Sequence, residues 1–179
     1  DSVVVNATRF PEDVRRLPAS VTVITPDDIA NSPARTLPEL LSDQVGITMT
    51  DFFGNNAAVT SIDMRGSGVT GGQNTLILVN GQRVGDIDLS SVQWSAIPLS
   101  NIERVEVLRG IGAVLYGDGA STGVINIVTR SPLKQGASAE LYGRAGTFNT
   151  QEGQVTASMV KDNFGVNATA YDFRSNGYR

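Results

Sequence analysis

Acidic side chains occur in close pairs at three places, and such pairs can serve acid–base chemistry or bind a cation. The pairs are Asp27/Asp28, Asp86/Asp88 and Glu103/Glu106. The first pair follows Pro26, where acidic residues stabilise the positive end of a helix dipole. Glu106 alternates with arginines, which favours an ion-pair network. Two carboxylates without further oxygen ligands are weak grounds for a metal site, so we expect a solvated loop at Asp86 and no metal ion.

Histidine and cysteine are both absent from the 179 residues. Their absence removes the usual proton carrier at neutral pH, the Ser-His-Asp and Cys-His catalytic groups, thiolate nucleophiles and disulfides. Few enzyme mechanisms remain. We therefore expect no catalytic residue, no cofactor and no enzymatic activity.

The run Gly66-Ser67-Gly68-Val69-Thr70-Gly71 has the spacing of a dinucleotide-binding loop. That fingerprint requires a helix to open after the last glycine. Here the chain continues into the apolar run Thr75–Val79 and the tight-turn pair Asn80-Gly81, which is typical of a β-hairpin. We interpret the glycines as a loop. A nucleotide-binding enzyme is the alternative, and it predicts a helix after Gly71.

The charge balance gives no sign of a nucleic-acid partner. There are 14 basic and 18 acidic residues, a net charge of −4, whereas nucleic-acid binding calls for a basic face. No apolar run approaches the ~18 residues of a membrane-spanning helix.

Short β-prone runs and short helices alternate before residue 131. Thr25 can cap a helix that begins at Pro26, and Thr36-Leu37-Pro38-Glu39 resembles a capping box for a helix through Gln44. The β-prone runs are Val3–Val5, Ala19–Thr25, Ile47–Thr50, Val59–Arg65, Thr75–Val79, Arg104–Arg109 and Val124–Val128. This inventory predicts an α+β domain with a small mixed sheet, because a doubly wound fold would show longer βαβ alternation.

Beyond Pro132 the pattern has a period of two. Val155, Ala157 and Met159 share one face, whereas Gln154 and Thr156 share the other. One apolar and one polar face on runs near ~9–11 residues is typical of transmembrane barrel strands. An amphipathic hairpin of a water-soluble protein is the alternative for these residues alone.

Four blocks of sequence together resemble the plug domain of TonB-dependent outer-membrane receptors. They are Ile62–Gly66, Leu76–Val84, Ile102–Gly110 and Leu115–Thr129. The resemblance covers Asp1–Arg130, and it implies three parts: a TonB box with its N-terminal segment at 1–10, a globular plug at 11–132, and the first antiparallel strands of an incomplete transmembrane β-barrel at 133–179.

The resemblance also implies roles for individual residues. The TonB box is the periplasmic segment that pairs with the energising protein TonB, and an extended β-branched segment suits strand addition to a partner's sheet edge. The residues similar to it are Asp1, Ser2, Val3, Val4, Val5, Asn6 and Ala7. Ligand contacts are expected from two apical segments, Asp51–Ala57 and Arg83–Trp94. The residues expected to make them are Phe52, Phe53, Asn55, Asn56, Arg83, Asp86 and Trp94. Polar contacts between plug and barrel wall are expected from Arg65, Glu103, Arg104, Glu106 and Arg109.

The function implied by this resemblance is active uptake of a scarce ligand across the bacterial outer membrane. A ferric siderophore is the first expectation, ahead of cobalamin, haem and oligosaccharides. TonB and the receptor's own barrel are the implied partners. The family barrel has about 22 strands, whereas this sequence ends after about three. The alternative function is therefore a separate plug-like module that docks on a membrane protein or on TonB without transport.

Overall fold

A computed structural model of the chain describes residues 4–5, 12–13, 20–52, 60–66, 68, 71–84, 92–110, 116–117, 119–130, 136–162 and 164–177. The chain divides into two compact units, Asp1–Thr129 and Arg130–Arg179, near the change in composition at Pro132. We call them the first and second units and describe each by itself.

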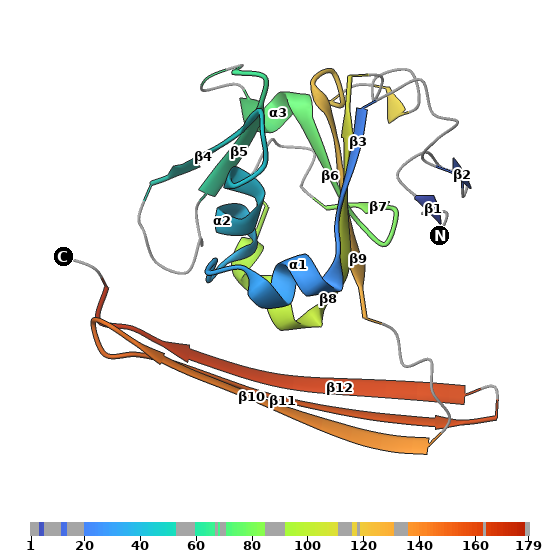
Figure 1. Cartoon of the computed structure of the whole chain (residues 1–179), viewed down its shortest axis with the longest axis vertical. Helices are drawn as coiled ribbons and strands as arrows, with labels where there is room; N and C mark the ends of the chain where they lie inside the picture. The colour runs from blue at the N-terminus through green and yellow to red at the C-terminus, as the bar shows by residue number, and fades with distance from the viewer. Residues whose placement is uncertain are drawn as a thin grey trace. The chain divides into compact units, whose positions relative to one another are not determined.

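A five-stranded mixed sheet organises the first unit (Figure 1). Its order is β3 (Ser20–Ile24), β8 (Ile102–Arg109), β9 (Gly123–Thr129), β6 (Thr75–Val79) and β7 (Gln82–Arg83). Strands β6 and β9 are parallel, and the other neighbours are antiparallel. The predicted mixed sheet is therefore confirmed.

Shorter elements surround this sheet. They are β1 (Val4–Val5), β2 (Glu12–Asp13), α1 (Pro26–Asn31), α2 (Leu37–Ser42), β4 (Ile47–Asp51), β5 (Thr60–Met64), α3 (Gly71–Asn74) and the 3-10 turns η3 (Trp94–Ala96) and η4 (Leu99–Asn101). Strands β1 and β2 pair with each other, as do β4 and β5. Within the described residues, none of the helices is long and apolar enough to cross a lipid bilayer.

Both α1 and α2 begin where the sequence predicts, after a capping threonine and with a proline at the first or second helical position. The Thr25 side chain accepts a hydrogen bond from the Asp28 amide, and the Asp28 carboxylate accepts one from the Thr25 amide. At α2 the Glu39 carboxylate instead accepts from the Arg35 amide, one residue before the cap Thr36. Helix α2 ends at Ser42, so the predicted extension to Gln44 is wrong.

The sheet separates two apolar clusters. The larger lies against α1, α2 and the β4–β5 pair, which Figure 1 shows on one side of the sheet, and contains Leu37, Leu40, Leu41, Val105, Val107, Ile125 and Ile127. The smaller contains Leu76, Leu78, Leu108, Ala120 and Val124. Alternation along β8 and β9 places Glu106 and Asn126 on the face of this smaller cluster.

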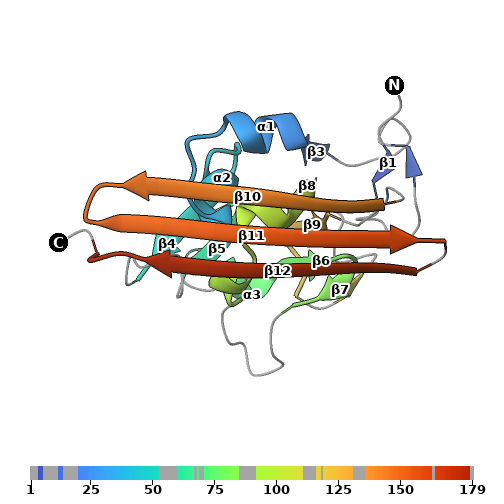
Figure 2. The ribbon, with the colours of Figure 1, turned by 90° about the horizontal axis from the view of Figure 1, so that it is seen from below.

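The second unit is a sheet of three long antiparallel strands (Figure 2). They are β10 (Gly136–Gly146), β11 (Thr150–Lys161) and β12 (Phe164–Arg174). The cross-strand register places Ala137 opposite Met159, and Met159 opposite Val166, so apolar residues share one face. The period-two pattern predicted beyond Pro132 is therefore confirmed.

Close packing leaves no room for a side chain at Gly123. A Cβ added there would lie 2.5 Å from the Leu108 carbonyl oxygen and 2.7 Å from Met64 Cε. We expect Gly123→Ala to destabilise the first unit by about 1–3 kcal/mol, because a backbone carbonyl cannot move aside as a flexible side chain can. Hydrogen exchange of the β8 and β9 amides measures the loss. Gly153→Ala, where an added Cβ meets no atom within 4 Å, is the control, and equal effects of the two variants would contradict the packing argument.

The cap of α1 gives the first unit a small acid dependence. Hydrogen bonds from the Thr25 hydroxyl and then the Thr25 amide hold the pKa of the Asp28 carboxyl below its ordinary value. A lowered folded-state pKa means that the stabilisation is present above the unfolded value of about 3.9 and is lost as the pH falls through the folded value. We therefore expect protection of the Ile29 amide, corrected for the intrinsic exchange rate, to decline below that pH. In Asp28→Asn the protection should not vary with pH, and an identical decline in the variant would contradict this assignment.

Candidate functional site

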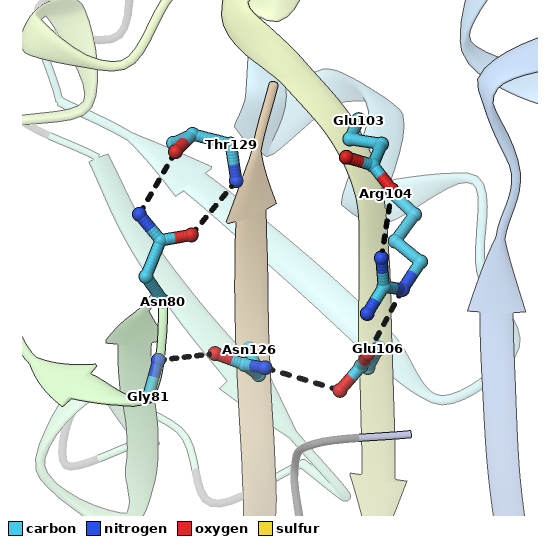
Figure 3. A network of polar contacts seen from close by, with 7 residues as sticks. All are labelled: Asn80, Gly81, Glu103, Arg104, Glu106, Asn126 and Thr129. Carbon is cyan, nitrogen blue, oxygen red and sulfur yellow. Dashed lines mark hydrogen bonds and ion pairs between the residues drawn. The ribbon is translucent and has the colours of Figure 1, made fainter. Parts of the chain in front are cut away.

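A buried carboxylate lies at the centre of the five-stranded sheet (Figure 3). The Glu106 side chain is fully buried. Its Oε1 accepts a hydrogen bond from Arg104 Nε at 3.0 Å, and its Oε2 accepts one from Asn126 Nδ2 at 3.0 Å. Arg104 Nη1 also donates to Glu103 Oε1 at 2.9 Å. Each Glu106 oxygen therefore has a donor, which a buried charge requires.

The same network reaches the turn between β6 and β7. Asn126 Oδ1 accepts from the Gly81 amide at 3.0 Å, and the neighbouring Asn80 side chain forms two hydrogen bonds with Thr129. Asn80 and Gly81 have φ angles of 51° and 79°, the left-handed values that a two-residue hairpin turn requires. The network thus joins strands β8 and β9 to the turn between β6 and β7.

This geometry corrects one predicted role. Glu106 was expected to contact the barrel wall, but it lies inside the sheet and is bound there by Arg104 and Asn126. Sequence reasoning missed Asn80, Asn126 and Thr129 as members of the network. A polar residue within the apolar run Val124–Val128 was the signal that could have found Asn126.

Two other arginines gather around the turn at Val45–Gly46. The Arg65 amide donates to the Gly46 carbonyl at 3.1 Å, and Arg109 Nη2 donates to the Val45 carbonyl at 3.1 Å. Arg109 Nη1 also donates to Thr22 Oγ1 at 2.6 Å. Partial burial lowers the pKa of the Arg109 guanidinium. We call Arg65 and Arg109 the arginine pair.

The arginine pair differs from Arg104 in its partners. Among the described residues, no carboxylate forms an ion pair with Arg65 or Arg109. Arg65 has φ of 69°, a strained value for a residue other than glycine, and its Nη2 lies 3.2 Å from the position of a Cβ on Gly110. The exposed Arg65 and the half-buried Arg109 are thus without a carboxylate partner among the described residues.

The residues expected to contact ligand have different environments. Phe52 is 61% exposed, and Arg83 is exposed with its Nη2 beside Gly119. Trp94 is only 4% exposed and packs in the larger core, so its ring is not offered to a surface ligand. Phe53, Asn55, Asn56 and Asp86 lie outside the described residues.

Of the predicted TonB box, the structure describes Val4 and Val5. They form β1, in which Val4 lies opposite Asp13 and Val5 opposite Glu12. This pairing shows that Val4 and Val5 lie in a short strand. The remaining predicted residues, Asp1, Ser2, Val3, Asn6 and Ala7, lie outside the described residues.

Two other kinds of site find no support in the described part of the chain. No group of three or more acidic residues there could hold a metal ion. After Gly71 the chain forms α3, which has four residues and leads directly into β6. We expected the chain to pass from Gly71 into a strand without a helix, so the single helical turn of α3 corrects that expectation. One turn is far shorter than the helix of a dinucleotide-binding unit, so it does not support a nucleotide site.

Comparison with known sequences identifies relatives that transport or receive ligands. The chain is 32% identical to the vitamin B12 transporter BtuB of Photobacterium profundum over 92% of its own length and 27% of that protein. It is 35% identical to BtuB of Vibrio cholerae over 89% of its own length and 25% of that protein. It is 31% identical to the ferric enterobactin receptor of Pseudomonas aeruginosa over 87% of its own length and 22% of that protein. The chain thus spans about a quarter of the length of these curated relatives.

Solved structures agree on the fold. The siderophore receptor PirA of Pseudomonas aeruginosa matches with a TM-score of 0.62 and 29% identity, over 90% of this chain and 30% of that one. The ferripyoverdine receptor of the same organism matches with a TM-score of 0.73 and 18% identity, over 94% of this chain and 22% of that one, a likeness of fold alone.

The family comparison covers the first unit most directly. Residues 13–124, more than half of the chain, match the family described as TonB-dependent Receptor Plug Domain. This match includes β3, β6, β7 and β8 of the mixed sheet and the first two residues of β9. It also includes the arginine pair and Glu106. The chain belongs to the TonB-dependent receptor plug domain family.

Proposed function

We propose that the natural polypeptide carrying this chain takes up a scarce metal chelate across the bacterial outer membrane, driven by TonB. The observation that carries the proposal is a plug domain followed directly by three strands suited to a membrane barrel. Their lengths of 11, 12 and 11 residues are close to the ~9–11 that a tilted membrane strand needs.

The two faces of the second unit support a position between lipid and a hydrated interior. Apolar side chains share one face: Ala137, Ala139, Leu141, Val155, Ala157, Met159, Val166, Ala168 and Ala170. Leu141 is 84% exposed and Met159 59%, as lipid-facing side chains would be before lipid covers them. The opposite face carries hydroxyl ladders, with Ser138 Oγ 3.0 Å from Ser158 Oγ and Thr156 Oγ1 3.3 Å from Thr169 Oγ1.

The edges of this sheet favour further strands in the natural polypeptide. An open edge in lipid leaves backbone groups without hydrogen bonds, so three strands cannot span a membrane by themselves. A denatured mass several times 18.9 kDa would agree with a transporter. A mass of 18.9 kDa would favour the separate plug-like binding module instead.

We propose a ferric siderophore as the first candidate ligand and cobalamin as the second. Two named relatives are a ferric enterobactin receptor and a vitamin B12 transporter, and both ligands are organic chelates of a metal ion. Phe52 offers an exposed apolar ring and Arg83 a cation to such a molecule. Binding of ferric enterobactin, ferripyoverdine and cyanocobalamin to the natural polypeptide tests the class. Failure of all three would contradict it.

Coupling to TonB is proposed through strand addition at Asp1–Ala7. Such pairing depends on main-chain N–H and C=O groups, which Val4 and Val5 present in an extended conformation. We expect Val4→Pro to reduce uptake of the bound chelate about tenfold or more, because proline removes an N–H, while leaving binding of the chelate intact. Val4→Thr keeps the N–H and the β-branch, so it should transport normally. Normal uptake in Val4→Pro, measured with radiolabelled chelate, would contradict the coupling role.

The arginine pair is proposed to anchor the plug to acidic groups of the barrel wall. The half-buried Glu103 and Arg104 are further, weaker candidates, since they already pair with each other. Replacing Arg65 and Arg109 together by glutamine should weaken the anchoring by about 2–5 kcal/mol, if each guanidinium has a buried carboxylate partner. We expect higher TonB-independent entry of vancomycin into cells carrying this double variant. Arg35→Gln, at an exposed position, is the control, and equal entry in the two strains would contradict the anchoring role.

A further inference from the structure

One buried hydrogen bond connects the parts of the plug that adjoin its two predicted ligand segments. Trp94 Nε1 donates to the Thr60 carbonyl oxygen at 2.8 Å. The two residues are 34 positions apart in the sequence, and both are at least nine-tenths buried. Because the indole N–H is a donor only, burying the ring without this acceptor would leave a polar group unpaired.

Thr60 lies at the base of the first ligand segment, Asp51–Ala57. It is the first residue of β5, and it pairs with Asp51, the last residue of β4. The Asp51–Thr60 pair therefore closes the β4–β5 ladder where the segment leaves and returns. The Trp94 indole N–H, which donates to the Thr60 carbonyl, is therefore held at the base of this segment.

Trp94 is the last residue of the second ligand segment, Arg83–Trp94. The start of this segment is held to the main sheet, since the Val84 amide donates to the Ile77 carbonyl at 3.1 Å. Its end is held in the larger core, where Trp94 packs with Ile62 and Ile102. Trp94 is thus part of the segment Arg83–Trp94, and its hydrogen bond to Thr60 connects it to the base of the segment Asp51–Ala57.

We propose that Trp94 is a positioning residue that sets the spacing between the Asp51–Thr60 pair and η3, which adjoin the two ligand segments, without touching the ligand. The inference rests on the proposed function for its consequence, which is ligand affinity, but not for its geometry. Its ring supplies the packing that holds η3 against β5, and its N–H selects one register of that packing. Residue 94 therefore affects ligand binding through the distance between the Asp51–Thr60 pair and η3.

The distance itself is the direct test. This chain has no cysteine, so thiols introduced at Thr50 and Gln93, both exposed and described, are the only sites within it for nitroxide spin labels. Any cysteine elsewhere in the natural polypeptide is replaced by serine. Pulsed electron resonance on the full natural polypeptide should give one narrow distance distribution. Replacing Trp94 by 3-benzothienylalanine, which keeps the bicyclic ring but has no N–H, should broaden or shift that distribution. Trp94→Phe, which also loses ring volume, should broaden it further.

A matched core variant separates positioning from general stability. Val107→Ala removes two methyl groups from a fully buried position on β8 and should lower the thermal midpoint without changing the Thr50–Gln93 distance. An unchanged distance in both Trp94 variants, or an equal change in Val107→Ala, would overturn the proposal.

Ligand affinity distinguishes failure of this inference from failure of the proposed function. Whichever of ferric enterobactin, ferripyoverdine or cyanocobalamin binds the wild type should bind the benzothienyl variant about tenfold more weakly, as expected for losing one buried hydrogen bond. Unchanged affinity despite an altered distance would overturn the positioning role. Failure of all three chelates to bind wild type would count against the proposed ligand class, while the distance measurement would still decide the geometry.

Discussion

The buried charge of Glu106 is the constraint on which the central sheet depends. An isolated carboxylate cannot be buried without a large loss of solvation energy, so its two oxygens require donors at fixed places. Arg104 donates from the same strand and Asn126 from the neighbouring strand. The Asn126 side-chain oxygen in turn accepts from the Gly81 amide, so both ends of its amide group are bonded. A one-residue slip of β9 against β8 would turn Asn126 to the other face and leave the carboxylate without its donor. The network therefore specifies the register of β9 against β8.

The charged residues of the plug fall into two groups with different consequences. Arg104 and Glu106 satisfy each other within the sheet, so they help to define the folded plug. The Arg109 guanidinium bonds to a hydroxyl and a backbone carbonyl, the Arg65 side chain is exposed, and among the described residues neither forms an ion pair with a carboxylate. A guanidinium bound only to neutral groups keeps a net attraction for an external anion. This difference is why the arginine pair, and not Glu106, is the better candidate for contact with a barrel wall.

Local features of the fold follow closely from the sequence, whereas the partners of the charged residues do not. The capping threonines, the Asn80-Gly81 turn and the period-two strands depend on neighbouring residues, and the structure has them where the sequence predicts them. Glu106 alternates with arginines in the sequence, and only the pairing of β8 with β9 shows that its second donor is an asparagine 20 residues away. Trp94 is similar: an aromatic residue in a predicted ligand segment looks like a contact residue until the fold places the Thr60 carbonyl beside it. The partners of Glu106 and Trp94 are both distant in the sequence, so the residues next to each of them do not predict which partner it has.

Direct contact between TonB and the N-terminal segment tests the account most directly. The measurement is disulfide cross-linking between a cysteine replacing Val5 in the full natural polypeptide, held in outer-membrane vesicles, and single-cysteine variants of the TonB periplasmic domain. The account predicts cross-links that form at alternate TonB positions along one strand, as strand addition requires, and that increase when the bound chelate is present. Absence of cross-links with and without chelate, in vesicles where the polypeptide is folded and binds its chelate, would contradict it.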